Sequence, residues 1–241
     1  MADYQETGVW HAGRAPPGRH YGEAPITITA QIRTMNETLS PDRIPRRGNA
    51  FSRWLGVWLL RLIGWRIVGE LPNVPKAVVI GAPHSSNYDG LVAAGVVLAL
   101  QVRIGLMAKD SLFRWPVAGL LRWLGGIPID RRSKRGVVEQ SLDRFREREQ
   151  LFLGIAPEGT RAAATQWKTG FWHIARHAEV PIIVAVLDYG RRELRFADVI
   201  IPSEDLDADM RRILMCFRGV VPRRPARLSA PLKALNDKPP R

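Results

Sequence analysis

A histidine and an aspartate stand five residues apart directly after a short apolar run. The run spans residues 77–82, and His84 and Asp89 follow it. An aspartate that accepts a hydrogen bond from one ring nitrogen fixes the histidine tautomer, so the other nitrogen is free to take a proton from a substrate hydroxyl. Because five residues exceed one helical turn, the pair can work together only if His84 lies in a loop and Asp89 near a helix start. The alternative is an exposed loop histidine with Asp89 as a helix cap.

Two further apolar runs are followed by arginine. Arg131 comes after the run 126–129, and the run 151–156 is followed by Glu158, Gly159, Thr160 and Arg161. A guanidinium binds phosphate oxygens in a bidentate geometry, so Arg131 and Arg161 are candidate phosphate ligands. Gly159 allows a tight turn, and Glu158 can orient Arg161 or bind a substrate hydroxyl. Taken singly, each arginine is better explained as a solvated surface charge, but two of them follow neighbouring strands beside a His/Asp pair.

The elements that must position these residues alternate between short apolar runs and helical stretches. Strands are predicted at 77–82, 103–107, 126–129, 151–156, 181–188 and 193–200. Helices are predicted at 91–100, 115–124, 137–148, 169–178 and 204–217. This alternation predicts a single α/β domain with a central mixed β-sheet flanked by helices. Ligands of such folds gather at the carboxyl ends of the strands, and His84, Arg131 and Glu158 each follow a strand.

The polar segments and their order resemble the four sequence blocks of the glycerolipid acyltransferases. The blocks are His84-x4-Asp89, 125–131, 157–161 and 180–183, and the resemblance covers about residues 75–190. It implies a glycerol-3-phosphate acyltransferase-like fold. It also implies that His84 deprotonates the acceptor hydroxyl with support from Asp89. The hydroxyl then attacks an acyl thioester directly, without a covalent acyl-enzyme.

The resemblance assigns roles to the cationic and polar residues as well. Positions that match Arg131, Glu158 and Arg161 bind the acceptor in the family, with arginine holding its phosphate. Gly159 and Thr160 belong to the same block, and we expect them at the substrate. Lys109 resembles a family lysine that lies near the site.

The acceptor is expected to be a lysophospholipid, chiefly lysophosphatidic acid, which would give phosphatidic acid. Family members also acylate glycerol phosphate, glycolipids and lyso-amino-acid lipids, so another lyso-lipid or a glycolipid is the alternative. Two departures bear on this choice: Pro83 stands where many members have asparagine, and residues 162–166 lack the longer basic segment of many members. We expect acyl-CoA or acyl carrier protein as the donor, and no cofactor.

A metal site is not expected. His173 and His177 are spaced to share a helix face, but no cysteine or cluster of acids joins them. The single cysteine, Cys216, cannot form an internal disulfide and is interpreted as a small core residue.

The charge of the chain predicts an anionic partner. Thirty-six Lys and Arg against 23 Asp and Glu give a net charge of +13. The bases concentrate at 43–69, with six arginines and no acid, and at 206–241, with nine bases and three acids. An anionic membrane surface, an acidic carrier and nucleic acid all fit such a charge. No nucleic-acid-binding signature appears, so nucleic acid is not expected. A catalytically silent basic lipid-binding module is the remaining alternative.

Residues 51–65 combine an apolar stripe with arginines at helical spacing. The stripe consists of Phe51, Trp54, Leu55, Trp58, Leu59 and Leu62, flanked by Arg53 and Arg61. Tryptophan and arginine on such a helix suit a membrane interface. The alternative is that the same stripe packs on the core.

The expected location is the cytoplasmic face of a membrane, with the protein monotopic. No run reaches the roughly 20 apolar residues that a spanning helix needs, and the polar opening residues do not fit a secretory signal. We expect a disordered tail at 1–48, the acyltransferase domain at 49–220 and a basic tail at 221–241.

Overall fold

The central element of the protein is a seven-stranded β-sheet. The computed structural model describes residues 9–10, 43–109, 114, 116, 118–119, 125–129 and 136–237. The strands are β2 (Arg66–Val68), β3 (Lys76–Ala82), β4 (Ile104–Lys109), β5 (Gly126–Ile129), β6 (Leu151–Ile155), β8 (Ile182–Asp188) and β9 (Glu193–Ile200). Their order across the sheet is β2-β9-β8-β3-β6-β4-β5. Only the β8–β9 pair is antiparallel, so the predicted mixed sheet is confirmed.

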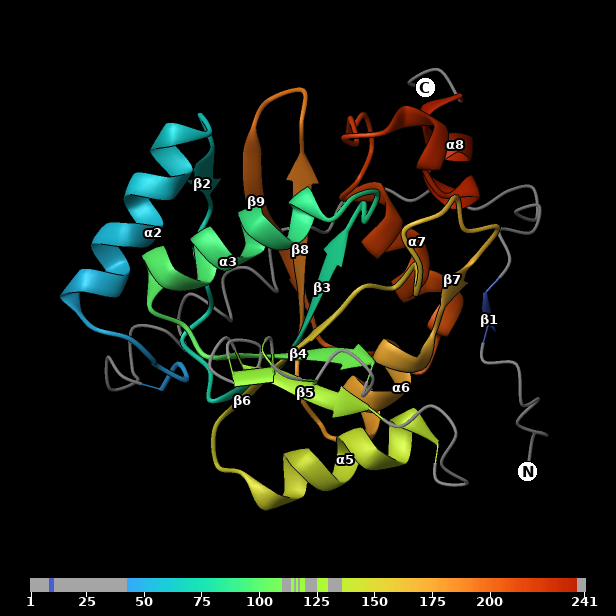
Figure 1. Cartoon of the computed structure of the whole chain (residues 1–241). Coiled ribbons are helices and arrows are strands. Elements are labelled where there is room, and N and C mark those ends of the chain that lie inside the picture. The colour runs from blue at the N-terminus through green and yellow to red at the C-terminus, as the bar shows by residue number, and fades with distance from the viewer. Residues whose placement is uncertain are drawn as a thin grey trace.

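Helices cover both faces of the sheet, so the predicted α/β class is confirmed as well (Figure 1). One face carries α2 (Ala50–Leu62) and α3 (Tyr88–Leu100). The other carries α5 (Val137–Glu147), α6 (Gly170–His177), α7 (Leu206–Met215) and α8 (Ala230–Asn236). The strands β3 and β8 send alternate side chains into these two cores, as the pleat of a strand requires.

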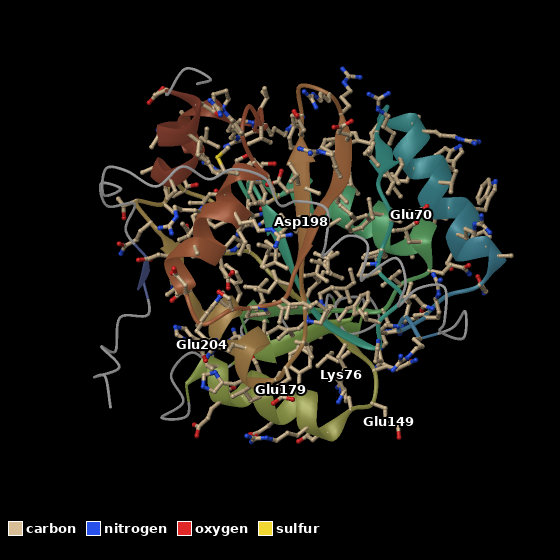
Figure 2. All side chains as sticks on the ribbon, turned by 180° about the vertical axis from the view of Figure 1, so that it is seen from behind. Glu70, Lys76, Glu149, Glu179, Asp198 and Glu204 are labelled. Atoms are coloured by element: carbon tan, nitrogen blue, oxygen red, sulfur yellow. The ribbon has the colours of Figure 1, made fainter. Side chains whose placement is uncertain are left out.

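The parallel strands place their carboxyl ends at one edge of the sheet. Strands β8, β3, β6, β4 and β5 all run in the same direction. Figure 2 shows the opposite edge, where Lys76 begins β3 and where Glu149 and Glu179 precede β6 and β8. The segments that carry the candidate site residues therefore leave the sheet at the edge away from these three charges.

The prediction of a disordered tail over residues 1–48 is wrong for residues 43–48, which belong to the folded domain. Ile44 is buried in the core under α2 and α3, and Arg46 forms an isolated antiparallel bridge with Val102. A further two-residue strand, β1 (Val9–Trp10), pairs with β7 (Trp167–Lys168). The remaining residues before 43, including the strand-like segment 26–32, lie outside the described residues.

The prediction of a basic tail over residues 221–241 is wrong for residues 221–237. This segment forms the short 3-10 helix η2 (Pro225–Arg227) and then α8. Leu228 and Leu232 are buried in the core, and Ser229 is fully buried. Because Pro and Arg are scattered through this segment, its sequence does not reveal that it folds back onto the domain.

Helix α2 turns its predicted apolar stripe outward. Its buried residues are Ser52, Gly56 and Leu60. Phe51, Trp54, Trp58 and Leu62 are 48–66% exposed. The alternative interpretation, in which the stripe packs on the core, is therefore wrong for these four residues. Within the residues that the structure describes, no helix is both long and apolar enough to cross a bilayer.

Helices α2 and α3 approach each other closely because glycine lies at their contact. A Cβ atom added at Gly56 would stand 2.4 Å from the backbone nitrogen of Ala99. Figure 1 shows α3 between α2 and the sheet, so α2 is carried on α3 at the periphery of the molecule. No side chain larger than that of glycine fits at position 56 without a shift of one helix.

Candidate active site

The histidine and the aspartate of the first block meet where β3 ends. His84 lies in the loop after β3, and Asp89 lies in the first turn of α3. The His84 Nδ1 atom is 3.3 Å from Asp89 Oδ2, and the His84 side chain is one-third exposed. The spacing predicts this arrangement, with His84 in a loop and Asp89 near a helix start, for two residues that act together. It leaves Nε2 as the ring nitrogen that is available to a substrate.

The Asp89 carboxylate is buried and surrounded by donors. Its Oδ2 accepts hydrogen bonds from the backbone nitrogens of Ser85 and Ser86, at 2.7 and 2.8 Å. Its Oδ1 accepts from the Ser86 hydroxyl at 3.0 Å. Burial pushes the pKa of Asp89 upward, but hydrogen bonds from His84, Tyr189 and Ser86 outweigh burial and lower the pKa to about 2. The carboxylate is therefore ionised near neutral pH and holds the Nδ1 proton of His84.

Tyr189 is a site residue that the sequence analysis missed. Its hydroxyl donates to Asp89 Oδ1 at 2.5 Å. Burial and the hydrogen bond to Asp89 both raise the pKa of Tyr189 above its usual value, so the phenol stays protonated as the donor. The ring packs edge-on against Trp65, with 4.8 Å between ring centroids. Tyr189 directly follows the predicted strand 181–188, and the carboxyl-end rule applied to that strand would have found it.

Glu158, in the loop after β6, holds the backbone of the loop that carries His84 (residues 83–87, the candidate catalytic loop). Its Oε2 accepts from the His84 backbone nitrogen at 2.5 Å, and the residue is 4% exposed. Burial raises the pKa of Glu158, and the hydrogen bond from His84 offsets this only in part. Its Oε1 has no hydrogen-bond partner among the described residues. Glu158 thus touches His84 directly, and contact with Arg161, which the sequence suggested, is not observed.

The rest of the third block forms a turn beside the first block. The Arg161 side chain is exposed and donates to the side chain of Asn87, which precedes α3. Gly159 has a φ of +65°, the left-handed conformation that favours glycine. The Thr160 hydroxyl accepts from the backbone of Ala162 within the same turn. Of this block, Arg161 and Glu158 contact the His84–Asp89 segment.

Three arginines of the presumed C-terminal tail also reach the catalytic loop. The Arg227 guanidinium donates to the Ser85 carbonyl, and the Arg224 backbone nitrogen donates to the Ser85 hydroxyl, both at 3.3 Å. The Arg223 guanidinium lies 4.3 Å from the centre of the Tyr88 ring. No ion pair joins these arginines to an acid in the described part of the chain. The side chains of Arg223 and Arg227 therefore add positive charge beside the catalytic loop, which the sequence did not reveal.

Several residues that the sequence predicts at the site lie wholly or partly outside the described residues. Lys109 ends β4 at the same edge as His84, and its side chain lies outside the described residues. Arg131 lies outside them too, two residues after the end of β5. The sequence also suggests four residues as the lining of a slot for the acyl chain, and these lie outside the described residues: Trp115, Leu120, Leu121 and Trp123.

Metal chemistry has no evident centre in the described segments. Among those residues, no group of three or more His, Cys, Asp or Glu could hold a metal ion. His173 and His177 lie on α6, where His177 Nδ1 contacts the His173 carbonyl oxygen at 2.8 Å.

A one-third-exposed histidine on a buried, ionised aspartate, at the carboxyl edge of an α/β sheet, is an arrangement that can activate a hydroxyl by removing its proton. The chain belongs to the Acyltransferase family, whose model matches residues 66–188. The family resemblance seen in the sequence is thereby confirmed.

Curated relatives give the same family. The chain is 32% identical over 165 residues to the 1-acyl-sn-glycerol-3-phosphate acyltransferase of Salmonella typhimurium and 31% identical over 165 residues to that of Escherichia coli K12. Each alignment covers 66% of this chain and 65% of the relative, so the chain spans just under two thirds of their length.

A solved structure shares the fold. The 1-acyl-sn-glycerophosphate (LPA) acyltransferase from Thermotoga maritima matches with a TM-score of 0.50 and 15% identity. The match covers 76% of this chain and 82% of that one.

Proposed function

We propose that the protein transfers a fatty acyl group from an acyl thioester to the free hydroxyl of lysophosphatidic acid, which gives phosphatidic acid. The observation that carries this proposal is the His84–Asp89 pair with the Arg161 guanidinium held beside it through Asn87. A base and a phosphate-binding cation at one sheet edge suit an acceptor with a hydroxyl and a phosphate close together. The activity for which the Salmonella and Escherichia relatives are named favours the same acceptor.

The proposed reaction is a direct displacement. His84 Nε2 takes the proton of the acceptor hydroxyl while the oxygen attacks the carbonyl carbon of the thioester. The tetrahedral intermediate then expels the thiolate, and the His84 imidazolium returns the proton to the sulfur. Asp89 keeps the imidazole in the tautomer with Nδ1 protonated and stabilises the imidazolium. The mechanism needs no metal or cofactor.

The test is acceptor-dependent release of free thiol, with lipid products identified by mass. Wild type and His84→Ala would be assayed with acyl-CoA and, separately, with acylated acyl carrier protein. Loss of a positioned base should lower kcat by about 10²–10⁴-fold. The matched control is His177→Ala, because His177 is exposed at the end of α6 and its ring nitrogen contacts the His173 carbonyl of the same helix. Equal activity of wild type and His84→Ala would refute the mechanism.

The acceptor panel separates the alternatives. Lysophosphatidic acid should be the preferred acceptor, whereas preference for another lyso-lipid or a glycolipid would keep the reaction and change the substrate. No release with any acceptor and either donor would favour a catalytically silent binding module. A steep salt-dependent mobility shift with any duplex would instead favour nucleic-acid binding.

We also propose that the protein works as a peripheral protein at the cytoplasmic face of an anionic membrane. The exposed Phe51, Trp54, Trp58 and Leu62 of α2 support this placement, since indole rings are favoured at headgroup depth. Phe51 and Trp54 stack, and so do Trp54 and Trp58, which makes the surface continuous. Sedimentation with anionic liposomes at low salt tests this placement. Recovery of the protein in the supernatant would contradict it.

A further inference from the structure

A cationic hollow lies away from the catalytic loop, between the segment before α2 and the end of α3. Its volume is about 520 Å3, within the range of about 300–1,000 Å3 typical of small-molecule sites. It is lined by Arg46, Arg47, Gly48, Arg53, Ala99, Leu100 and Gln101. Three of these side chains are cationic and none is acidic. The hollow therefore favours an anion.

An apolar hollow adjoins the cationic one. Its volume is about 490 Å3, and its lining includes Trp54 and Val57. The two hollows share Arg53 and Gln101 in their linings, so they lie next to each other and together form a two-part depression. Trp54 also belongs to the exposed aromatic surface of α2. A ligand that fills both hollows needs an anionic group and an apolar part side by side.

Arg46 is held in place without being neutralised. Arg46 donates one guanidinium nitrogen to the Leu100 carbonyl at 2.9 Å, which fixes its position and leaves other donors available. No acid forms an ion pair with Arg46 or Arg53 in the described part of the chain. The sequence contains no acid between residues 43 and 69.

We propose that this depression binds one anionic phospholipid, with its phosphate against Arg46 and Arg53 and its glycerol-acyl region against Trp54 and Val57. The lipid is a membrane component bound outside the catalytic site and is not the acyl acceptor. The role of the bound lipid, though not the site itself, rests on the proposed membrane placement. A single bound lipid would fix the depth and the rotation of α2 at the membrane, which a diffuse charge attraction cannot do.

The apolar hollow decides between a lipid and a free anion. Inorganic phosphate would fill only the cationic part, and its affinity would not depend on Trp54. A phospholipid buries apolar surface against Trp54 and Val57 in addition to its phosphate contacts, and so binds more tightly than phosphate alone.

The experiment follows the Trp54 signal by 19F NMR on protein labelled with 5-fluorotryptophan, assigned with Trp54→Phe. The probe is dihexanoyl phosphatidylglycerol below its micelle concentration, compared with dihexanoyl phosphatidylcholine and inorganic phosphate. The anionic lipid should shift the Trp54 signal saturably, at one equivalent, and more strongly than that of Trp58. Phosphatidylcholine should bind about tenfold more weakly, because its phosphate carries a choline cation that the two arginines repel.

Variants of equal charge separate a site from a diffuse field. Arg46→Gln with Arg53→Gln should weaken binding by about tenfold or more. The control, Arg61→Gln with Arg66→Gln, removes two nearby charges outside the hollow and should change the affinity by less than about threefold. Arg53→Gln alone, with thermal unfolding as a check, covers the case in which loss of Arg46 disturbs the fold.

Four outcomes would overturn the proposal: equal losses in the two double variants, equal binding of both lipids, equal binding of inorganic phosphate, or an unmoved Trp54 signal. Failure to bind anionic liposomes while the soluble lipid still shifts Trp54 would refute the membrane placement and leave the lipid site standing. Acyl transfer does not enter this test, so a failure of the catalytic proposal is recognised separately.

Discussion

Two neighbouring strands are each followed, at the carboxyl edge of the sheet, by one buried carboxylate, and the pKa values of the two groups are shifted in opposite directions. Asp89, after β3, is 2% exposed, and hydrogen-bond donors surround it. Glu158, after β6, is 4% exposed, and one of its oxygens lacks a partner. The pKa of Asp89 is lowered to about 2, whereas the pKa of Glu158 is raised. The number of donors, more than burial, decides whether a buried acid serves as a charge or as a structural acceptor.

The largest test of this contrast is Asp89→Asn. The amide cannot stabilise an imidazolium, and its NH2 group would face donors that now bond to oxygen, so kcat should fall by about 100-fold or more. Steady-state acyl transfer measures this. Asp209→Asn is the control, because Asp209 is also buried and accepts from Trp172 and Ser203. Comparable losses of kcat in both variants would show a general folding defect.

The acid stability of the protein should depend on Asp89. A folded-state pKa of about 2, against 3.8 for the unpaired group, is worth roughly 2 kcal/mol of stability above pH 4. A lowered pKa stabilises the fold above the unfolded value, and this contribution is lost as the pH falls from about 4 towards 2. Urea unfolding of wild type and Asp89→Asn between pH 2.5 and 7 should show a difference that shrinks on acidification. A constant difference would contradict the assigned pKa.

Tyr189→Phe sharpens the contrast by removing one donor from Asp89. The ring contacts with Trp65 and Arg223 remain, and kcat should fall about tenfold with little change in KM, because one hydrogen bond to a charged group is lost. The amides of Ser85 and Ser86, which donate to the same carboxylate, should exchange faster in the variant. Tyr88→Phe is the control, since that ring also lies under Arg223. If kcat and the amide exchange rates of Tyr189→Phe equal those of wild type, Tyr189 has only a packing role.

The smallest effect is expected for Glu158→Gln. Glutamine keeps a carbonyl oxygen for the His84 backbone nitrogen, and kcat should stay within about threefold of wild type. Because burial raises the pKa of Glu158, the ionised acid costs stability as the pH rises above 4.5, and the variant should gain relative stability from pH 4 to 8. Denaturant titrations at both pH values measure this. A large loss of kcat would mean that the carboxylate contacts substrate, as the family resemblance implies.

The sequence predicted the parts of the site that lie close together along the chain. The His84–Asp89 pair follows from one apolar run and one spacing, and the seven residues of β8 are all buried, as their apolar composition predicts. Tyr189 lies 100 residues from the carboxylate that it holds. That contact depends on β3 and β8 being neighbours in the sheet, which strand patterns alone do not reveal.

The C-terminal segment was missed for a different physical reason. Residues 221–229 are rich in Pro and Arg, a composition typical of a solvated tail. They are held by a few buried contacts, such as the hydrogen bond from Trp167 to the buried Ser229. Such contacts involve single side chains, so they leave no periodic signal in the sequence.

The close contact of α2 with α3 ties the outer surface of the molecule to its chemistry. Gly56 brings α2 against the C-terminal half of α3, and the N-terminus of α3 carries Asp89. A 13-residue helix is about 20 Å long, so α3 acts as a stiff arm between the aromatic surface and the catalytic pair. Under the proposed membrane placement, this arm sets the orientation of His84 towards the lipid plane, and the encounter with a lipid acceptor takes place in two dimensions. A bulkier residue at position 56 would then misalign the proposed active site with that plane while leaving His84 and Asp89 themselves unchanged.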